Sequence, residues 1–198
     1  QRNICANLDA MSDIVHDFDC RDTFLSVLPV HHVFECSAGF MLATYLGACT
    51  AFNTGLRHIM EDLRDFQVSF LVCVPALYEM MYKGLLKSLE KAGKLEAVMQ
   101  LAEAHQNDTM EQKAAIFKEI HAAFGGHVKI FISGAAALDI NVERGYRNFG
   151  INMIQGYGLT EASPVVCANE RTGKNKDEHV YGTIGKVVIN GEAKIDNP

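Results

Sequence analysis

The most informative stretch of this sequence is INMIQGYGLTE, residues 151–161. Its apolar start, at 151–154, predicts a short buried strand, which Gly156 and Gly158 then break on either side of Tyr157. Glycines let a backbone turn sharply and let a ligand approach it closely. An aromatic face, a hydroxyl and a carboxylate then follow in quick succession. The sequence here predicts either a nucleotide site or an ordinary glycine-rich turn.

Three side chains of this stretch have the chemistry that a nucleotide site needs. Tyr157 offers a flat face for a base, and Thr160 offers a hydroxyl for a phosphate. Glu161 offers a hard oxygen ligand of the kind that Mg²⁺ prefers. In the alternative interpretation, Tyr157 packs into the core and Glu161 is solvated, which is the commoner outcome for an arbitrary Gly-Tyr-Gly turn.

Outward from this stretch, apolar runs alternate with helical patterns along the chain. The runs are apolar throughout, which is typical of parallel strands with both faces covered by helices. The predicted fold class is therefore α/β, a mostly parallel sheet flanked by helices. Strands are expected at 23–28, 47–52, 69–74 and 128–132, and helices at 2–17, 34–46, 59–66, 76–89 and 140–149.

Two regions depart from this alternation. Residues 84–126 carry many charges and no strand signal, so they predict a helical insertion in which Asp108 and Glu111 have capping-box spacing. Residues 181–198 combine glycines with a short apolar run, which predicts the start of a small, truncated β-rich region after a first domain at 1–180.

Two polar features border the last strands. Residues 169–179 predict an exposed, mobile loop. Small residues at 133–137 follow a strand, where they permit either a ligand against the backbone or a tight turn with Asp139 as the N-cap of the next helix.

Composition excludes several classes of function. The net charge is −6 with no basic run, which argues against a nucleic-acid surface. The six cysteines form no CxxC pair, so we expect reduced, mostly buried thiols and a cytoplasmic location. No apolar run reaches the roughly 18 residues that span a bilayer, and no signal peptide is visible.

Four ordered segments resemble one family. They are LSVLPVHHVFE at 25–35, FISGAAAL at 131–138, QGYGLTEASP at 155–164 and GTIGKVVINGEAKI at 182–195. Together they resemble the adenylate-forming superfamily, and they are most similar to long-chain fatty acyl-CoA synthetases. The resemblance covers nearly the whole chain, but the chain covers only part of the family's sequence. It implies a central fragment of the large N-terminal domain.

The resemblance assigns roles to particular residues. His32 ends the turn Pro29-Val30-His31-His32, which implies a place near the acyl carboxylate and the α-phosphate, where it would support developing charge. A satisfied structural histidine is the alternative. Thr160 and Glu161 join His32 as the implied catalytic residues, with Glu161 as the magnesium ligand. The implied nucleotide-binding residues are Ser133, Gly134, Ala135, Ala136, Gln155, Gly156, Tyr157, Gly158 and Thr160.

Geometry adds one expectation to these roles. His32, Ser133 and Tyr157 each follow a predicted strand, so a single crevice at the carboxyl edge of the sheet can hold all three. An acyl pocket would use apolar residues around Phe34, Val74 and 131–134, although a plain core explains them equally well.

The resemblance also implies a reaction and its cofactors. ATP and Mg²⁺ would activate a carboxylic acid, most readily a fatty acid, as acyl-AMP, and coenzyme A would then take the acyl group. The family's phosphate loop, ribose-binding aspartate and C-terminal lysine are not present, so the fragment alone is expected to be inactive. The alternatives are a ligase that loads a carrier protein, a non-catalytic nucleotide-binding module and, least favoured, a structural domain. No nucleic-acid partner is expected, no basic amphipathic segment indicates a membrane partner, and the oligomeric state is not determined.

Overall fold

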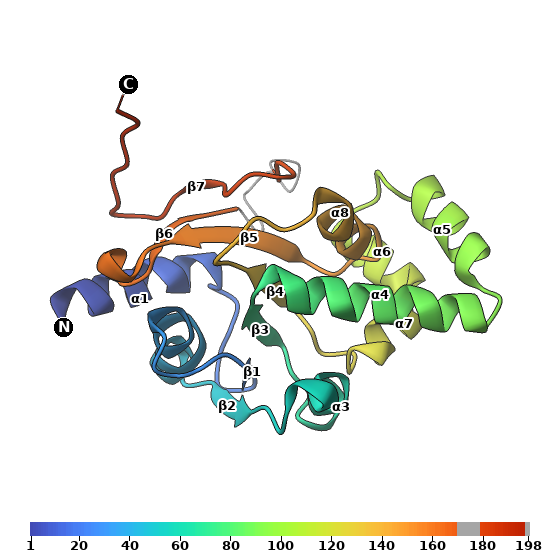
Figure 1. Ribbon diagram of the computed structural model, residues 1–198, viewed down its shortest axis with the longest axis horizontal. Coiled ribbons are helices and arrows are strands. Elements are labelled where there is room, and N and C mark those ends of the chain that lie inside the picture. Colours follow the sequence, from blue (N-terminus) through green and yellow to red (C-terminus); the bar gives the residue numbers. More distant parts are fainter. Residues whose placement is uncertain (170–178, 197–198) are drawn as a thin grey trace.

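The computed structural model describes residues 1–169 and 179–196. Its strands form one sheet in the order β2-β1-β3-β4-β5-β6-β7 (Figure 1). The first five in that order are parallel, and β6 and β7 are antiparallel to their neighbours. The predicted α/β class is confirmed. The strands are β1 Thr23–Ser26, β2 Cys49–Phe52, β3 Phe70–Cys73, β4 Ile130–Ser133, β5 Met153–Gly158, β6 Val165–Ala168 and β7 Lys186–Val187.

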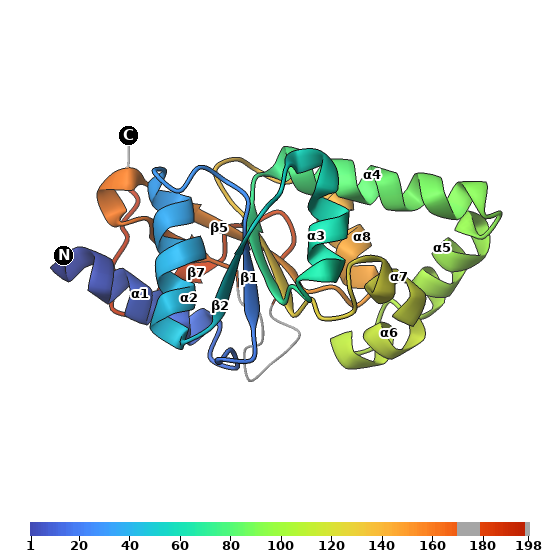
Figure 2. The same cartoon turned by 90° about the horizontal axis from the view of Figure 1, so that it is seen from below.

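Helices cover the parallel part of the sheet on both faces, as Figure 2 shows. One face carries α1, η1 and α2, and the other carries the helices from α3 to α8. The helices are α1 Arg2–Ile14, the π-helix η1 Glu35–Met41, α2 Leu42–Leu46, the 3₁₀-helix η2 Leu56–His58, α3 Ile59–Asp65, α4 Pro75–Lys91, α5 Leu95–Ala104, α6 Met110–Ile116, α7 Lys118–Ala123, α8 Ile140–Asn148 and the 3₁₀-helix η3 Thr160–Ala162.

Strand β3 lies in the middle of the parallel strands, and this position explains why its sequence is continuously apolar. Successive side chains of a strand point to opposite faces of the sheet. Phe70 and Val72 pack into a core with α1 and α2, whereas Leu71 and Cys73 pack into a second core with α3, α4 and α8. Both faces of β3 are therefore dry, and no polar position remains along it.

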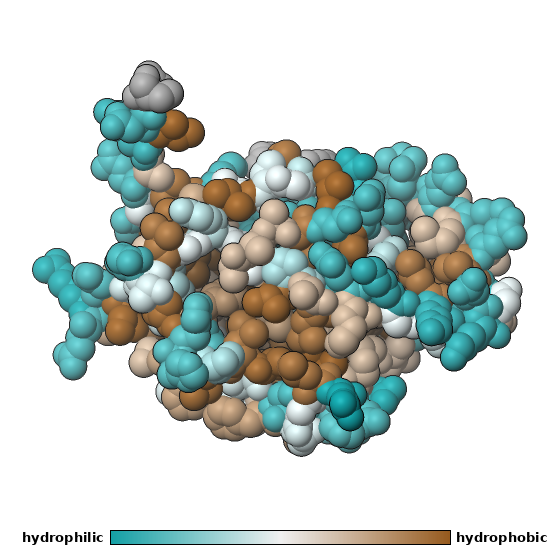
Figure 3. Space-filling model, viewed as in Figure 1, coloured by the Kyte–Doolittle hydropathy of each residue, from teal (hydrophilic) through white to brown (hydrophobic). Residues whose placement is uncertain are grey.

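Parallel register brings the ends of the strands together. Ser133 at the end of β4 lies beside Cys73 of β3 and Gln155 of β5. The segments that follow β1, β4 and β5 consequently leave the sheet at one edge, the upper edge in Figure 2. In the space-filling view of Figure 3, apolar residues gather over the middle of the molecule, between α2 and α4.

The helical insertion is confirmed, but its predicted cap is displaced by one residue. Within 84–126 the end of α4 is followed by α5, α6 and α7. The capping box of α6 uses Thr109, whose Oγ1 accepts from Gln112 N at 3.3 Å while Gln112 Oε1 accepts from Thr109 N at 2.9 Å. Asp108 instead faces His105 at 2.8 Å. Thr109 has the extended backbone that an N-cap requires, with ψ 160°. Asp139 caps α8 as predicted.

The break predicted at the two glycines of the Gly-Tyr-Gly stretch is wrong. Strand β5 runs on through Gly158, with a register shift between Tyr157 and Gly158. The reason is a strand that the sequence analysis did not predict: β6 pairs antiparallel with Gly156–Gly158. A Cβ at Gly158 would collide with the carbonyl oxygen of Pro164, so the glycine permits this close approach.

Two further expectations concern the cysteines and the chain's end. All six cysteines are free thiols, but Cys5, Cys20 and Cys49 are exposed and only Cys73 and Cys167 are buried, so the prediction of mostly buried thiols is wrong. Cys5 lies on the outer face of α1, Cys20 on a turn and Cys49 on the edge strand β2, and local apolar content does not reveal such exposure. In 179–196 one short strand, β7, extends the sheet. The boundary at residue 181 stays a prediction.

Among the described helices, none combines the length and the apolar character that crossing a bilayer requires.

Candidate functional site

A cavity of about 340 Å³ opens at the carboxyl edge of the sheet, on the face covered by α1 and η1. This volume lies in the range of pockets that hold small ligands. Segments from four parts of the chain enclose it: α1, the region 32–42, the ends of β3 and β4, and the stretch 156–168.

The depth of the cavity is apolar. Phe70, Val72 and Ile132 point into it from the sheet because they share one face of neighbouring strands. The opposite wall is formed by Met11 and Ile14 of α1, Val15 directly after it, Ala38 of η1 and Leu42 of α2. Such a lining favours an apolar ligand.

The mouth of the cavity is polar and exposed. His32, Tyr157, Thr160 and Glu161 line it, and Tyr157 keeps 44% of its surface exposed. The structure thus brings together most of the residues that the sequence analysis singled out. The predicted residues that line this one cavity are His32, Phe34, Gly134, Ala135, Gly156, Tyr157, Gly158, Thr160 and Glu161.

Four other predicted residues do not line it. Ser133 and Gln155 alternate with cavity-facing neighbours along β4 and β5, so their side chains lie on the opposite face of the sheet, where both are buried. Val74, expected near an acyl group, packs with the core on that opposite face for the same reason. Ala136 is exposed beyond the rim.

His32 is held in one orientation by its own turn. Its ring Nδ1 accepts a hydrogen bond from the backbone N–H of Phe34 at 3.2 Å, and the backbone N–H of His32 donates to the carbonyl of Pro29 at 2.9 Å. A nitrogen that accepts from an amide carries no proton, so the neutral ring carries its proton on Nε2. His32 can therefore present an N–H donor to a ligand at the mouth.

The loop after β4 shows local strain at the cavity wall. Ala135 lines the cavity with φ 71°, a left-handed conformation that costs a non-glycine residue about 1–2 kcal/mol. Its neighbour Gly134 lies directly under the ring of Phe34, and a Cβ there would stand 2.8 Å from Cζ of that ring. The loop and the ring together define the width of the cavity.

Glu161 fits only one kind of metal site. In the described part of the chain, no group of three histidine, cysteine, aspartate or glutamate side chains is arranged to hold a metal ion. Glu161 is exposed at the cavity mouth beside Thr160. A lone carboxylate suits Mg²⁺, which commonly takes one or two protein ligands and completes its shell with water and ligand phosphates.

Glu35, the first residue of η1, is a buried carboxyl group beneath this site. It has no exposed surface, its Oε2 accepts from Leu28 N at 3.3 Å, and its Oε1 has no hydrogen-bond partner among the described residues. Burial raises the pKa of Glu35, although hydrogen bonds from Ser26 and Leu28 oppose this. The hydrogen bond between Leu28 and Glu35 joins the two ends of the segment 28–35, which carries His32.

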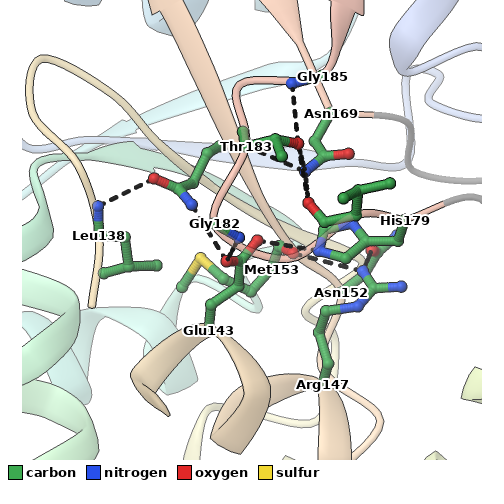
Figure 4. Close-up of polar contacts among 12 residues, drawn as sticks. Leu138, Glu143, Arg147, Asn152, Met153, Asn169, His179, Gly182, Thr183 and Gly185 are labelled. Carbon is green, nitrogen blue, oxygen red and sulfur yellow. Dashed lines mark hydrogen bonds and ion pairs between the residues drawn. The ribbon is translucent and has the colours of Figure 1, made fainter. Parts of the chain in front are cut away.

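A buried polar network on the other side of β5 was missed by the sequence analysis (Figure 4). Its centre is Glu143 of α8, which has no exposed surface and accepts from Gln155, His179 and Gly182. The predicted loop at 169–179 lies outside the described residues except for its ends, and both end side chains are buried here. A signal existed: Glu143 lies on the same helical stripe as Val142 and Tyr146, which are core residues.

The chain matches the family model described as "AMP-binding enzyme" over residues 1–198. Two curated relatives illustrate the match. The long-chain-fatty-acid–[acyl-carrier-protein] ligase AEE15 of Arabidopsis thaliana is 29% identical over 220 residues, which cover 89% of this chain and 29% of that protein. The long-chain-fatty-acid–CoA ligase 3 of Saccharomyces cerevisiae is 30% identical over 188 residues, which cover 88% of this chain and 26% of that protein.

Solved structures agree with the fold. The N-terminal domain of FACL13 from Mycobacterium tuberculosis matches with a TM-score of 0.65 at 15% identity, covering 94% of this chain and 38% of that one. The long-chain-fatty-acid-CoA ligase FadD1 from Archaeoglobus fulgidus matches with a TM-score of 0.63 at 18% identity, covering 94% of this chain and 32% of that one. The chain spans less than a third of the length of the curated relatives named above.

Proposed function

Because the chain belongs to the AMP-binding enzyme family, we propose that it forms the central ligand site of an ATP-dependent acid–thiol ligase acting on long-chain fatty acids. One observation carries this proposal. A single apolar cavity opens between a histidine, a tyrosine, a threonine and a glutamate, namely His32, Tyr157, Thr160 and Glu161. The names of the two relatives support the choice of a long acyl substrate.

The acyl chain occupies the apolar depth of the cavity in this proposal. Its hydrocarbon contacts Phe70, Val72 and Ile132 on the sheet side, where removal from water is favourable. Its carboxylate remains at the mouth, near the Nε2–H of His32. That donor stabilises negative charge on the carboxylate and on the α-phosphate as the two approach each other.

The nucleotide lies across the mouth. The adenine stacks on the exposed ring of Tyr157 and lies against the backbone of the loop Gly134–Ala136, where small side chains leave room. The hydroxyl of Thr160 binds a phosphate oxygen. Glu161 would hold Mg²⁺, which neutralises phosphate charge when it is bound.

The reaction has two steps. A carboxylate oxygen forms a bond to the α-phosphorus of ATP, and the bond from that phosphorus to the bridging oxygen breaks, which releases pyrophosphate and leaves acyl-AMP. The sulfur of a thiol then forms a bond to the acyl carbon and releases its proton to solvent, while AMP leaves with the electron pair of the acyl–oxygen bond. The residues of this chain bind and orient the reactants, because phosphoryl transfer depends mainly on positioning and on charge neutralisation.

Two thiol acceptors fit this site. Coenzyme A is the acceptor that the name of the yeast relative states, and an acyl carrier protein is the acceptor that the name of the Arabidopsis relative states. Both deliver a pantetheine thiol to the same acyl carbon. We propose coenzyme A as the acceptor and keep the carrier protein as the second candidate.

The test is calorimetric binding of a non-hydrolysable long-chain acyl-adenylate mimic to this chain. Tyr157→Ala is expected to weaken binding by about tenfold or more, because base stacking on an aromatic ring contributes roughly 1–3 kcal/mol. Tyr157→Phe keeps the ring and is expected to bind as the wild type does.

The matched control is Tyr45→Ala. Tyr45 is also an exposed tyrosine, with 53% of its surface accessible, but it lies on α2 and does not line the cavity. Equal losses of affinity in Tyr45→Ala and Tyr157→Ala, or no binding by the wild type, would contradict the proposed site.

A further inference from the structure

Two segments, the end of β5 and residues 179–185, meet behind β5 at one carboxylate, and the loop after β4 is joined to it through Gln155. Glu143 Oε2 accepts from Gln155 Nε2 at 3.1 Å and from the backbone N–H of Gly182 at 3.0 Å. Its Oε1 accepts from His179 Nε2 at 2.9 Å. Figure 4 shows Glu143 below these groups, with Leu138 on one side and Asn169 on the other. The helix α8 therefore contacts both the end of β5 and the segment 179–185.

Gln155, which donates to Glu143, also contacts the loop after β4. Its Oε1 accepts from the backbone N–H of Leu138 at 2.9 Å in a fully buried position. Because a carboxylate only accepts and a backbone N–H only donates, the amide of Gln155 has a single orientation that satisfies both neighbours. Loss of the Glu143 carboxylate removes the group that fixes this orientation.

The positions of these contacts connect them to the cavity. Leu138 ends the loop whose residues Gly134 and Ala135 line the cavity wall, and Gln155 directly precedes the Gly156–Gly158 end of β5. The two walls that would hold the adenine are thus joined on the far side of the sheet. Neither Glu143 nor Gln155 lines the cavity itself.

The segment 179–185 is held from its other side by Asn169. The Nδ2 of Asn169 donates to the carbonyl of Val180 at 3.0 Å and to that of Thr183 at 3.2 Å. The backbone N–H of Asn169 donates to the carbonyl of Gln155 at 2.8 Å. Both sets of contacts therefore return to Gln155, through its side chain and through its backbone.

Helix α8 supplies a positive charge, Arg147, as well as the negative charge of Glu143. Arg147 lies one turn after Glu143, is 5% exposed and donates to Asn152 Oδ1 at 2.8 Å. Burial lowers the pKa of Arg147, whereas Tyr181 and Glu143 raise it. A buried carboxylate with several donors and a nearby guanidinium is well compensated, and removing it leaves donors without an acceptor.

We propose that Glu143 is a positioning residue for the adenylate site. Its carboxylate fixes the loop 134–138, the Gly156–Gly158 end of β5 and the segment 179–185 in one arrangement, and it thereby sets the affinity for the nucleotide without contacting it. This inference rests on the proposed function, because the nucleotide is the ligand of that function.

Four variants test the proposal by calorimetric binding of the long-chain acyl-adenylate mimic, each measured under conditions where circular dichroism shows the variant folded. Glu143→Ala is expected to weaken binding by about tenfold or more, since small misplacements of binding groups are costly. Glu143→Gln keeps an oxygen that can accept from Gln155 and Gly182, so it is expected to stay within about threefold of the wild type. Gln155→Met removes the same connection from the other side and is expected to match Glu143→Ala, so it decides the question if Glu143→Ala does not fold.

Asp62→Ala is the matched control for stability. Asp62 is also a buried carboxylate, 4% exposed, and it accepts three hydrogen bonds from Asn53 and Thr54 at 2.6–2.9 Å. It lies on α3, away from the cavity. Its loss should lower thermal stability and leave the affinity for the mimic unchanged. An equal loss of affinity in Asp62→Ala and Glu143→Ala would overturn the proposal.

Amide hydrogen exchange separates the positioning role from the function. In Glu143→Ala the amide of Gly182 loses its acceptor directly, but the amide of Leu138 changes only if Gln155 is released. Faster exchange at Leu138 supports the proposal, and unchanged exchange at Leu138 overturns it. A wild-type chain that does not bind the mimic would contradict the proposed function, and the exchange at Leu138 then still decides whether Glu143 positions the loop.

Discussion

The two polar regions beside β5 are built in opposite ways. On the cavity side, His32, Tyr157, Thr160 and Glu161 are exposed. On the α8 side, Glu143 and Gln155 are buried, and each makes hydrogen bonds at both ends of its polar group. A group that binds a ligand is exposed to water until the ligand replaces that water. A buried polar group has no water, so it needs permanent hydrogen-bond partners within the protein. The contrast separates residues that contact a ligand from residues that hold the site.

This comparison predicts that substitutions on the α8 side change stability most. Arg147→Met is expected to lower the free energy of unfolding by about 3 kcal/mol, because the guanidinium is buried and charged hydrogen bonds of this kind are strong. Two acceptors, Asn152 Oδ1 and the carbonyl of Met153, lose their donor. Urea denaturation monitored by circular dichroism measures the change.

The control for that prediction is Arg144→Met on the same helix. Arg144 is exposed and lies over the ring of Tyr181, 5.2 Å from its centroid. An exposed cation–π contact contributes about 0.5–1 kcal/mol, so its loss should be small. Comparable losses in Arg144→Met and Arg147→Met would show that burial does not distinguish the two sides of α8.

On the cavity side, Glu161→Gln is expected to change binding and not stability. Without the carboxylate, the increase in ATP affinity that Mg²⁺ produces should fall by about tenfold, as is typical when a metal site loses a supporting group. The free energy of unfolding should remain within about 0.5 kcal/mol of the wild type, because the side chain is exposed.

Titrations of ATP with Mg²⁺ and with EDTA measure this effect. Glu103→Gln on α5 is the control, since Glu103 is equally exposed and does not line the cavity. If Mg²⁺ enhances ATP binding to Glu161→Gln as much as it does to the wild type, Glu161 is not the metal ligand.

Gly134→Ala tests whether the apolar depth and the polar mouth of the cavity bind different parts of the ligand. The new Cβ would stand 2.8 Å from Cζ of Phe34, so the ring must shift into the apolar depth. The affinity for a long-chain acyl-adenylate mimic is expected to fall by about fivefold, which corresponds to roughly one buried methylene. Binding of AMP, measured on the same samples by calorimetry, should not change. The new Cβ points at Phe34, so the loop backbone on which the adenine is proposed to lie stays free. A parallel loss for AMP would show that the shift of Phe34 disturbs the nucleotide as well.

Glu35 is the exception that tests the comparison, because it is buried on the cavity side and one of its oxygens has no partner in the described part of the chain. Burial raises its pKa, so the folded state binds the proton more tightly than the unfolded state does. The wild type therefore loses stability as pH rises from the ordinary glutamate range near 4.3 through the raised pKa.

Glu35→Gln should remove this loss. The variant and the wild type are expected to have similar unfolding free energies in acid, and the variant should become relatively more stable as pH approaches 7. Urea denaturation between pH 4 and 7 measures the difference. A wild type that gains stability relative to the variant as pH rises would mean that Glu35 is stabilised as a carboxylate.

Periodicity was enough to predict the frame. The continuous apolar runs at 23–28, 69–74 and 128–132 became β1, β3 and β4, because a strand between two helical layers has no face for polar residues. The family prediction is confirmed by the match over residues 1–198. Asp139 capped α8 as its position before a helical stripe predicts.

The differences from the predictions have separate origins. Strand β5 continues through two glycines because β6, which lies 7 to 12 residues further along, pairs with it. The resemblance assigns Gln155 to the nucleotide, and this assignment stays a prediction, but the alternation of β5 directs the side chain towards Glu143. The capping box lies at Thr109 and not at Asp108, because α6 begins one residue later than the sequence pattern predicts.

Periodicity in the sequence predicted the α/β class and placed most of the strands and helices, although it did not predict β6. The resemblance to a family, and not periodicity, named the residues that meet at the cavity. The rule that parallel strands end at one edge then predicted that these residues share a crevice. Only the packing in three dimensions shows which face of β5 each side chain occupies, that α1 closes the apolar cavity, and that Glu143 holds both the end of β5 and the segment 179–185. Such contacts join residues far apart in the chain, and a side chain's partners there depend on packing, which no local pattern encodes.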